Sequence, residues 1–236
     1  MIAVDGPAAA GKSTVAQALA DRIGAMLFDT GTLYRALTLA AIQDKVSFAA
    51  GPALARLASR RHIDVTPPSR PDGRLYDVHL DGEDVTWPIR DADVEAAVSE
   101  VSAHPEVRAA LLPIQRRIAS RGPVVMVGRD IGTVVVPDAG VKVFLEASLQ
   151  ERARRRHQEL LNRGESLSYD DVVADLKRRD ELDTGRLVAP LRVAPDAFVI
   201  STDDRDVDAV VSQLEDLVAN AQAGRTLPTA GSRSRP

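Results

Sequence analysis

The sequence predicts an α/β protein whose core is a parallel five-stranded sheet flanked by helices. Short apolar runs alternate with segments of helical periodicity at the start of the chain, an order that is typical of parallel sheets. Apolar runs of the same kind return in the second half of the chain. Of the 236 residues, 44% are hydrophobic and 27% are charged, the balance of a globular chain with a sizeable core.

The N-terminal elements alternate in the expected order. Residues 2–4 form a short apolar run, and residues 13–23 follow with helical spacing after a glycine-rich turn. Residues 26–28 form a second apolar run, and residues 31–42 again repeat apolar side chains at helical spacing. This order predicts two parallel strands, each followed by a helix.

A different pattern occupies residues 62–89. Apolar residues alternate there with polar ones, and Pro67-Pro68, Asp72-Gly73 and Asp81-Gly82 are turn signals. The segment therefore predicts a small antiparallel sheet inserted into the parallel one. Helical periodicity resumes over residues 92–118, with an interruption near Pro105.

The core pattern returns with two apolar runs, residues 124–127 and 141–145, which are typical of buried strands and are separated by a loop. Residues 149–182 are then dense in charge and are predicted to be helical, with a break near Gly164. A last strand at residues 197–200 and a last helix at about residues 207–221 complete the predicted core.

The strongest functional signal is a phosphate-binding loop. Gly6-Pro7-Ala8-Ala9-Ala10-Gly11-Lys12-Ser13 fits G-x-x-x-x-G-K-[ST] at every required position, between a predicted strand and a predicted helix. Its glycines let backbone N–H groups converge on phosphate oxygens, and the helix N-terminus favours negative charge. Lys12 would reach the β- and γ-phosphates, and the Ser13 hydroxyl would bind Mg²⁺. Together with Thr14, these residues form the expected ATP site.

Several classes of nucleotide-binding protein share this loop, which does not by itself name a reaction. A switch GTPase needs Asn-Lys-x-Asp to read guanine, and the sequence lacks it. A motor-type ATPase usually has an apolar strand that ends in aspartate, whereas the candidate strand here ends in Val127-Gly128. A kinase for a small molecule is the remaining interpretation.

Two further motifs carry a resemblance to a known family. Asp29-Thr30-Gly31-Thr32-Leu33-Tyr34-Arg35 and Gly128-Arg129-Asp130-Ile131-Gly132-Thr133-Val134-Val135 closely resemble motifs of bacterial cytidylate kinase, in the nucleoside monophosphate kinase family. Residues 142–148 and 179–191 are also similar, so the resemblance covers about residues 2–220. It implies transfer of the γ-phosphoryl group of ATP to CMP or dCMP.

The resemblance also implies an organisation into parts. The core would comprise residues 1–32, 108–148 and 187–223, with a monophosphate-binding insertion at 33–107 and a helical lid at 149–186. The small antiparallel sheet would belong to the insertion. Residues 224–236 are small, polar and punctuated by proline, and we expect a disordered tail there.

The acceptor site follows from the resemblance, position by position. Thr30 and Arg35 would lie at the monophosphate, and Arg129 and Arg186 would reach its phosphate. Arginine suits this task because guanidinium forks bind phosphate oxygens in a fixed geometry. The residues that would read cytosine are Ser99, Arg108 and Asp130, and those near the ribose are Arg179 and Asp183. Ser102 lies one helical turn from Ser99, which leaves the choice of serine open.

A run of arginines, Arg152, Arg154, Arg155 and Arg156, lies on a predicted helix. Such a run is more often a solvated face than a site. The lid of the resembled family, however, closes arginines onto the phosphates of ATP in this region. We therefore expect Arg155 or Arg156 to be catalytic.

One departure from the family concerns the metal. Val127 stands where bacterial cytidylate kinases commonly have an acidic residue. If that acid holds water on Mg²⁺, then Asp130, Asp5 or water alone must do so here. Asp130 is therefore predicted to be catalytic, together with Lys12.

The composition restricts the compartment and the partners. The net charge of −4 lacks the basic surplus of a nonspecific nucleic-acid binder, and the absence of cysteine excludes disulfides and thiolate chemistry. No apolar run approaches the roughly 20 residues of a membrane helix. We expect a cytoplasmic monomer that binds small molecules and neither nucleic acid nor a membrane. A kinase for UMP or for a metabolite such as shikimate, and a nucleotide-sensing module without turnover, are the alternatives.

Overall fold

The structure is a computed structural model that describes residues 1–224. Of the predicted tail, all residues after Gly224 lie outside this range. The described residues divide into two compact units: the first comprises residues 1–19 and 128–224, and the second comprises residues 20–127. None of the helices within residues 1–224 has the length and apolar content that a membrane crossing requires.

Five strands form one sheet in the order β2-β6-β1-β7-β8. They are β1 (Ile2–Asp5), β2 (Met26–Asp29), β6 (Val124–Gly128), β7 (Val141–Glu146) and β8 (Phe198–Ser201). The pairings of β1 with β7, of β2 with β6 and of β7 with β8 are all parallel. Every residue of β1 and β6 is buried, so both faces of these strands are covered. The predicted α/β class with a parallel five-stranded sheet is confirmed.

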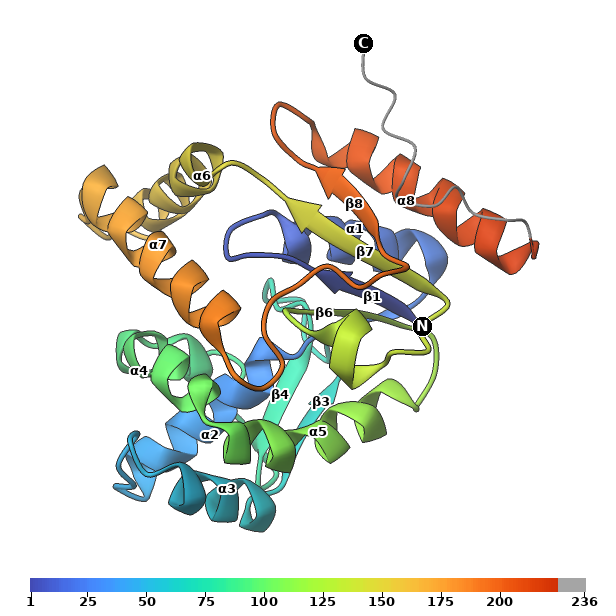
Figure 1. Ribbon diagram of the computed structural model, residues 1–236. Helices are drawn as coiled ribbons and strands as arrows, with labels where there is room; N and C mark the ends of the chain where they lie inside the picture. Colours follow the sequence, from blue (N-terminus) through green and yellow to red (C-terminus); the bar gives the residue numbers. More distant parts are fainter. Residues whose placement is uncertain (225–236) are drawn as a thin grey trace. The chain divides into compact units, whose positions relative to one another are not determined.

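The first unit holds β1, β7 and β8 side by side (Figure 1). Ile2 lies opposite Val141, and Val143 lies opposite Phe198. Its helical elements are α6 (Leu149–Asn162), α7 (Tyr169–Gly185), α8 (Val207–Gln222) and one π turn, η2 (Ile131–Val135). The helix α1 (Lys12–Ile23) begins in this unit. The predicted break near Gly164 is confirmed as the connection between α6 and α7, which pack together. The turn η2 falls where the sequence predicted an irregular loop.

The second unit is mainly helical around β2 and β6. Its helices are α2 (Gly31–Gln43), α3 (Gly51–Arg60), η1 (Pro88–Arg90), α4 (Ala92–Ala103) and α5 (Pro105–Ala119). The separation of α4 from α5 at Pro105 confirms the predicted interruption. The sequence analysis did not predict α3, although its buried Leu54, Leu57 and Ala58 have helical spacing and Pro52 lies in its first turn.

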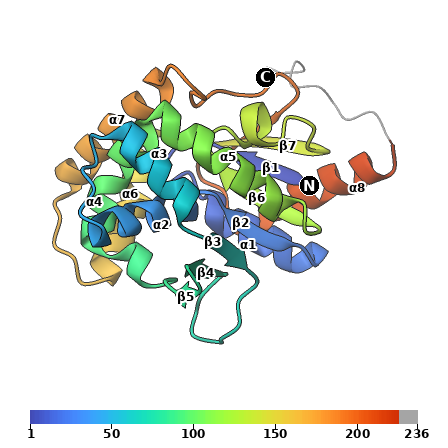
Figure 2. The ribbon, with the colours of Figure 1, turned by 90° about the horizontal axis from the view of Figure 1, so that it is seen from below.

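A small antiparallel sheet completes the second unit, as predicted (Figure 2). Its strands are β3 (Ile63–Thr66), β4 (Asp77–Leu80) and β5 (Glu83–Asp84). Asp81 and Gly82 join β4 to β5 with φ values of 52° and 88°, the positive pair that a two-residue hairpin of type I′ requires. The side chain of Arg74 joins its loop to strands β4 and β5, because it pairs with Asp72 of the loop, Asp77 of β4 and Asp84 of β5 at 2.7–2.8 Å.

Candidate functional site

The phosphate loop turns tightly between β1 and α1. A Cβ atom on Gly6 would lie 2.1 Å from the Leu145 carbonyl oxygen, so a side chain cannot be placed there without moving the backbone. Gly11 has a φ of 81° and Ala9 a φ of 59°, both in the left-handed region. The loop therefore has the irregular backbone that lets N–H groups point at an anion.

Lys12 folds back over this loop. Its Nζ atom donates a hydrogen bond of 2.6 Å to the Pro7 carbonyl oxygen, and the residue is buried. A buried ammonium needs such an acceptor, and phosphate oxygens could take the place of this carbonyl. Ser13 is half-buried and Thr14 exposed in the first turn of α1.

A cluster of cations surrounds Asp183, near the end of α7. Arg129 donates from Nε to the carboxylate at 2.7 Å, and Arg186 donates to its other oxygen. Burial alone would raise the pKa of Asp183. The charges of Arg129 and Arg186, together with that of Lys12, lower it by more, so the pKa of Asp183 lies below its usual value. Phosphate oxygens could compete with the Asp183 carboxylate for these three cations, which suits a phosphate-binding site.

Arg179 lies one helical turn before Asp183 on α7, where its side chain pairs with Asp175 at 2.8 Å. The two residues that the resemblance assigned to the ribose are therefore on one helix.

Asp5, at the end of β1, holds the segment that carries Arg129 and Asp130. Its two carboxylate oxygens accept hydrogen bonds of 2.8 Å from the backbone N–H groups of Ile131 and Gly132. Burial raises the pKa of Asp5 to about 6, even though these bonds lower it, and the charge of Asp130 raises it further. Sequence analysis named Asp5 only as a candidate for the outer shell of the metal, and no motif showed that it supports this turn.

The oxygen donors near the phosphate loop are few. Among residues 1–224, no group of three or more histidine, cysteine, aspartate or glutamate side chains could hold a metal ion. The donors expected from the sequence are the Ser13 hydroxyl and the buried Asp130 carboxylate. Mg²⁺ usually keeps several waters and takes one or two protein oxygens besides phosphates. The donor set therefore fits a magnesium ion carried by a nucleotide, and it does not fit an ion held by protein alone.

The arginine run on α6 is not a uniform solvated face, because its side chains differ widely in exposure. Arg152 is buried, forms two bonds to Asp180 at 3.0 and 2.7 Å, and donates to the Ala8 carbonyl oxygen at 3.3 Å. Arg154 has an exposed side chain, and Arg156 pairs with Glu159 on the same helix at 2.9 Å. No sequence signal distinguishes Arg152 from its neighbours.

In the second unit, Thr30 and Arg35 lie at the start of α2. The Thr30 hydroxyl donates to the Val127 carbonyl oxygen at 3.0 Å, so it is fixed at the end of β6. Arg35 forms an ion pair of 2.6 Å with Glu95 of α4, a partner that no motif indicated.

Arg108 of α5 is buried beside the two serines of α4. Its guanidinium carbon lies 5.4 Å from the centre of the Tyr34 ring, and Nη1 donates to the Ser102 carbonyl oxygen at 3.3 Å. Ser99 is half-buried, and its carbonyl oxygen accepts a hydrogen bond from the Ser102 hydroxyl. The structure thus brings Arg108 and both candidate serines together. The stacking of Arg108 on Tyr34 was missed, although Tyr34 lies in a recognised motif.

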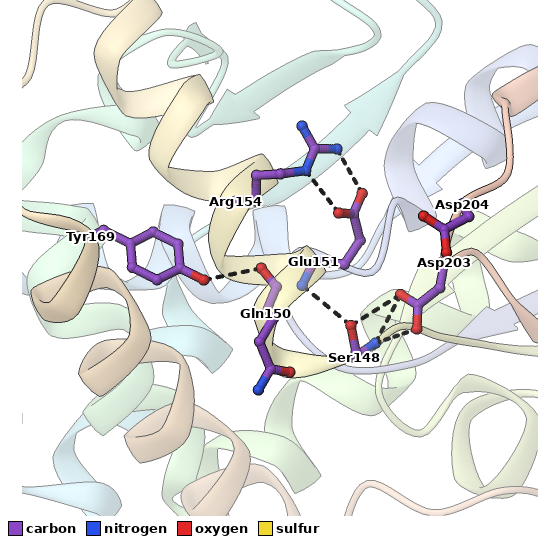
Figure 3. Close-up of a pocket in the computed structure, with 7 residues that line it drawn as sticks. All are labelled: Ser148, Gln150, Glu151, Arg154, Tyr169, Asp203 and Asp204. Atoms are coloured by element: carbon purple, nitrogen blue, oxygen red, sulfur yellow. Dashed lines mark hydrogen bonds and ion pairs between the residues drawn. The ribbon is translucent and has the colours of Figure 1, made fainter.

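A cavity of about 450 Å³ opens at the start of α6 (Figure 3). It is lined by Ser148, Gln150, Glu151, Arg154, Tyr169, Asp203 and Asp204. The Ser148 backbone N–H donates to both carboxylate oxygens of Asp203, which joins the start of α6 to the segment after β8. Sequence analysis did not identify this cavity, because its residues come from segments far apart in the chain.

Comparisons with known proteins agree with one another. The family model described as cytidylate kinase matches residues 2–220. The protein named cytidylate kinase from Herpetosiphon aurantiacus is 50% identical over 223 residues, covering 94% of this chain and 96% of that protein. Its namesake from an Exiguobacterium species is 44% identical, with coverages of 94% and 97%. A crystal structure of an uncharacterized protein from Eubacterium ventriosum shares the fold, with a TM-score of 0.51, 13% identity and coverages of 92% and 97%.

Proposed function

Since the chain belongs to the cytidylate kinase family, we propose that it transfers the γ-phosphoryl group of ATP to CMP and dCMP, forming CDP or dCDP. The family predicted from the motifs around Thr30 and Arg129 is confirmed, and with it the enzyme class, a phosphotransferase that acts on small-molecule nucleotides. The observation in the structure that carries the proposal is the cluster of Lys12, Arg129 and Arg186 around Asp183. Such a cluster can neutralise a phosphate that receives another phosphoryl group.

On the donor side, residues 6–14 bind the phosphates of ATP. Lys12 would exchange the Pro7 carbonyl oxygen for phosphate oxygens, and Ser13 and Asp130 would hold Mg²⁺ directly or through water. Asp5 keeps the Asp130 segment in place. Mg²⁺ on the β- and γ-phosphates would neutralise developing charge. Transfer breaks the bond between the γ-phosphorus and the bridging oxygen of ADP, and it forms a bond to an oxygen of the CMP phosphate. The protein needs no covalent intermediate, only positioning and charge neutralisation.

On the acceptor side, the CMP phosphate binds Thr30, Arg35, Arg129 and Arg186, and the ribose lies near Arg179 and Asp183. Cytosine is read by Ser99, Arg108 and Asp130, with Ser102 as the alternative serine. The placement of Arg108, against the Tyr34 ring and the Ser102 carbonyl oxygen, supports a role in base reading. The pairing of Arg35 with Glu95 supports a role at the phosphate, because a second anion can compete for the same guanidinium.

We assign residues 33–107 to a CMP-binding insertion and residues 149–186 to a lid that supplies Arg155 or Arg156. The lid would exclude water from the transferring group. We further infer a cytoplasmic monomer that does not bind nucleic acid, in keeping with its net charge of −4.

The test is release of ADP from ATP and Mg²⁺ with CMP, dCMP, UMP and AMP supplied as acceptors at equal concentration. The proposal expects CMP and dCMP to raise ADP production far above the rate without acceptor, and above the rates with UMP and AMP. Equal stimulation by UMP would favour a broader pyrimidine kinase. Tight binding of ATP with no response to any acceptor would favour a nucleotide sensor and would contradict the proposal.

A further inference from the structure

Arg155 reaches the phosphate loop at its second glycine. Its Nη1 atom donates to the Thr202 hydroxyl at 2.9 Å, and its Nη2 atom donates to the Thr202 carbonyl oxygen at 2.6 Å. The Thr202 hydroxyl in turn lies 3.3 Å from the Ala10 carbonyl oxygen of the loop. A Cβ atom on Gly11 would lie 3.5 Å from Nη1 of Arg155, an ordinary van der Waals contact. The guanidinium therefore lies directly beside the loop that would hold the phosphates.

Glu151 holds the same guanidinium from the other side. One of its oxygens accepts from Nε of Arg155 at 2.8 Å and from Nη2 of Arg154 at 2.7 Å. The pairing of Glu151 with Arg154 is drawn in Figure 3. The hydrogen bond from Arg154 is the largest cause that lowers the pKa of Glu151 to about 2, so this carboxylate stays ionised at neutral pH. Each nitrogen of the Arg155 guanidinium thus has a defined acceptor.

Helix α6 is itself fixed to the phosphate loop in the first unit. Ala8 of the loop belongs to one buried apolar cluster with Ala153 and Leu160 of α6. Arg152 adds a hydrogen bond to the Ala8 carbonyl oxygen, but its bidentate pair with Asp180 commits it to joining α6 to α7. This anchoring makes the position of Arg155 beside Gly11 a property of the folded unit.

Arg156 has a different partner, although it follows Arg155 directly. It pairs with Glu159, one turn further along α6, and Glu159 also accepts from Arg163. The helix therefore carries two glutamates that each hold two arginines, Glu151 near the phosphate loop and Glu159 further from it along α6. This arrangement provides a matched pair of positions for comparison.

We propose that Glu151 and Thr202 are positioning residues that hold Arg155 beside the phosphate loop, and that Arg155 rather than Arg156 binds the phosphates of ATP. This inference rests on the proposed function, since it assigns roles within the donor side of that site. An arginine that is already oriented needs no reorganisation when charge develops, so its interaction with phosphate is worth more.

The first test compares Glu151→Gln with Glu159→Gln. Glutamine keeps the shape and one acceptor oxygen but removes the charge that holds Arg155. We expect Glu151→Gln to lower kcat/KM for ATP by about 10-fold and to leave KM for CMP within about 2-fold, as lost donor-side stabilisation requires. Glu159→Gln is expected to change kcat/KM for ATP by less than about 2-fold. Equal effects of the two variants, or a larger effect of Glu159→Gln, would overturn the proposal.

The second test separates positioning from a general structural role. Arg155→Ala is expected to lower kcat/KM for ATP by about 10²-fold, a typical loss for one electrostatic contact to the reacting group. Glu151→Gln and Thr202→Val should each lower kcat/KM for ATP when introduced into the wild type. Neither should lower it further when introduced into Arg155→Ala. Losses that multiply would show independent effects on the fold, and a greater loss for Arg156→Ala would assign the role to that residue instead. If Glu151→Gln lowers the melting temperature strongly, the same comparison with Arg155→Ala can be made with Thr202→Val alone.

ATP binding measured by calorimetry without any acceptor distinguishes this proposal from the proposed function. Arg155→Ala and Glu151→Gln should weaken ATP binding whether or not CMP is the acceptor. One possible result is that the wild type binds ATP but fails to phosphorylate CMP, while the two variants bind ATP more weakly than the wild type. That result would reject the cytidylate kinase activity and retain the role of Arg155. Unchanged ATP affinity in both variants would reject the role of Arg155.

Discussion

Asp5 is a buried carboxylate whose protonation should govern how stability depends on pH. Both of its oxygens accept backbone N–H groups, from Ile131 and Gly132, yet burial raises its pKa from 3.8 to about 6. The folded state therefore binds the proton more tightly than the unfolded state. The stability that this proton contributes is fully present below pH 3.8 and is lost as the pH rises through about 6.

The size of the effect follows from the pKa values. A shift of about two units corresponds to about 3 kcal/mol, at roughly 1.4 kcal/mol per unit. Because the unfolded group is partly ionised at pH 4, about 2 kcal/mol of this falls between pH 4 and pH 7. The variant Asp5→Asn does not titrate. Its amide places an N–H₂ group against a backbone N–H group, which lowers the free energy of unfolding. This loss is independent of pH, so it shifts the plot of unfolding free energy against pH without changing its slope.

The assay is urea unfolding of the wild type and Asp5→Asn at pH 4, 5, 6 and 7. We expect the free energy of unfolding of Asp5→Asn, relative to the wild type, to rise by about 2 kcal/mol over this interval. The exposed Asp138→Asn serves as the control for the general effect of removing one negative charge. Parallel curves for the wild type and Asp5→Asn would refute the reasoning, because the proton would then bind the two states of Asp5 equally.

Four further variants test the proposed site. Lys12→Ala should lower kcat by about 10²- to 10³-fold in a folded protein, and near-normal kcat would contradict its role at the phosphates. Arg35→Ala should raise KM for CMP far more than KM for ATP, so an unchanged KM for CMP would reject its place at the acceptor phosphate. Asp130→Asn should lower the ratio of kcat/KM for CMP to that for UMP by about 10-fold or more, whereas a role at the metal alone would leave the ratio intact. Gly6→Ala should abolish ATP binding measured by calorimetry, since its Cβ would lie 2.1 Å from a carbonyl oxygen; normal binding would show that the loop can shift.

The strands and the phosphate loop could be predicted because their signals are local. A buried strand is a short apolar run, and the loop needs particular glycines whose backbone geometry no other residue adopts easily. The helix α3 has a weak sequence signal, because it has only 10 residues and its buried apolar side chains are only Leu54, Leu57 and Ala58. The π turn after Asp130 has no local signal. It depends on Asp5, which is 126 residues away in the chain and accepts the N–H groups of the turn.

The candidate acceptor residues came from motifs rather than from physical reasoning about single side chains. Nothing in the sequence next to Arg35 indicated Glu95, and nothing next to Arg129 indicated that Asp183 would be its partner. These pairs join segments that only the fold brings together. The roles of Arg35 and Arg129 in binding CMP stay predictions. To bind them, the CMP phosphate would have to compete with Glu95 and Asp183.

The arginines of α6 could not be told apart in the sequence, because their partners also lie far away along the chain. Arg152 and Arg155 lie three residues apart on one helix, but their partners are Asp180, 28 residues further on, and Thr202, 47 residues further on. Each cation beside the phosphate loop is thus held by an acceptor of the protein. Lys12 has the Pro7 carbonyl oxygen, and Arg155 has Thr202. A site built in this way needs no basic surplus, because its positive charges are balanced in the folded chain, and so the net charge of −4 neither indicated nor opposed it.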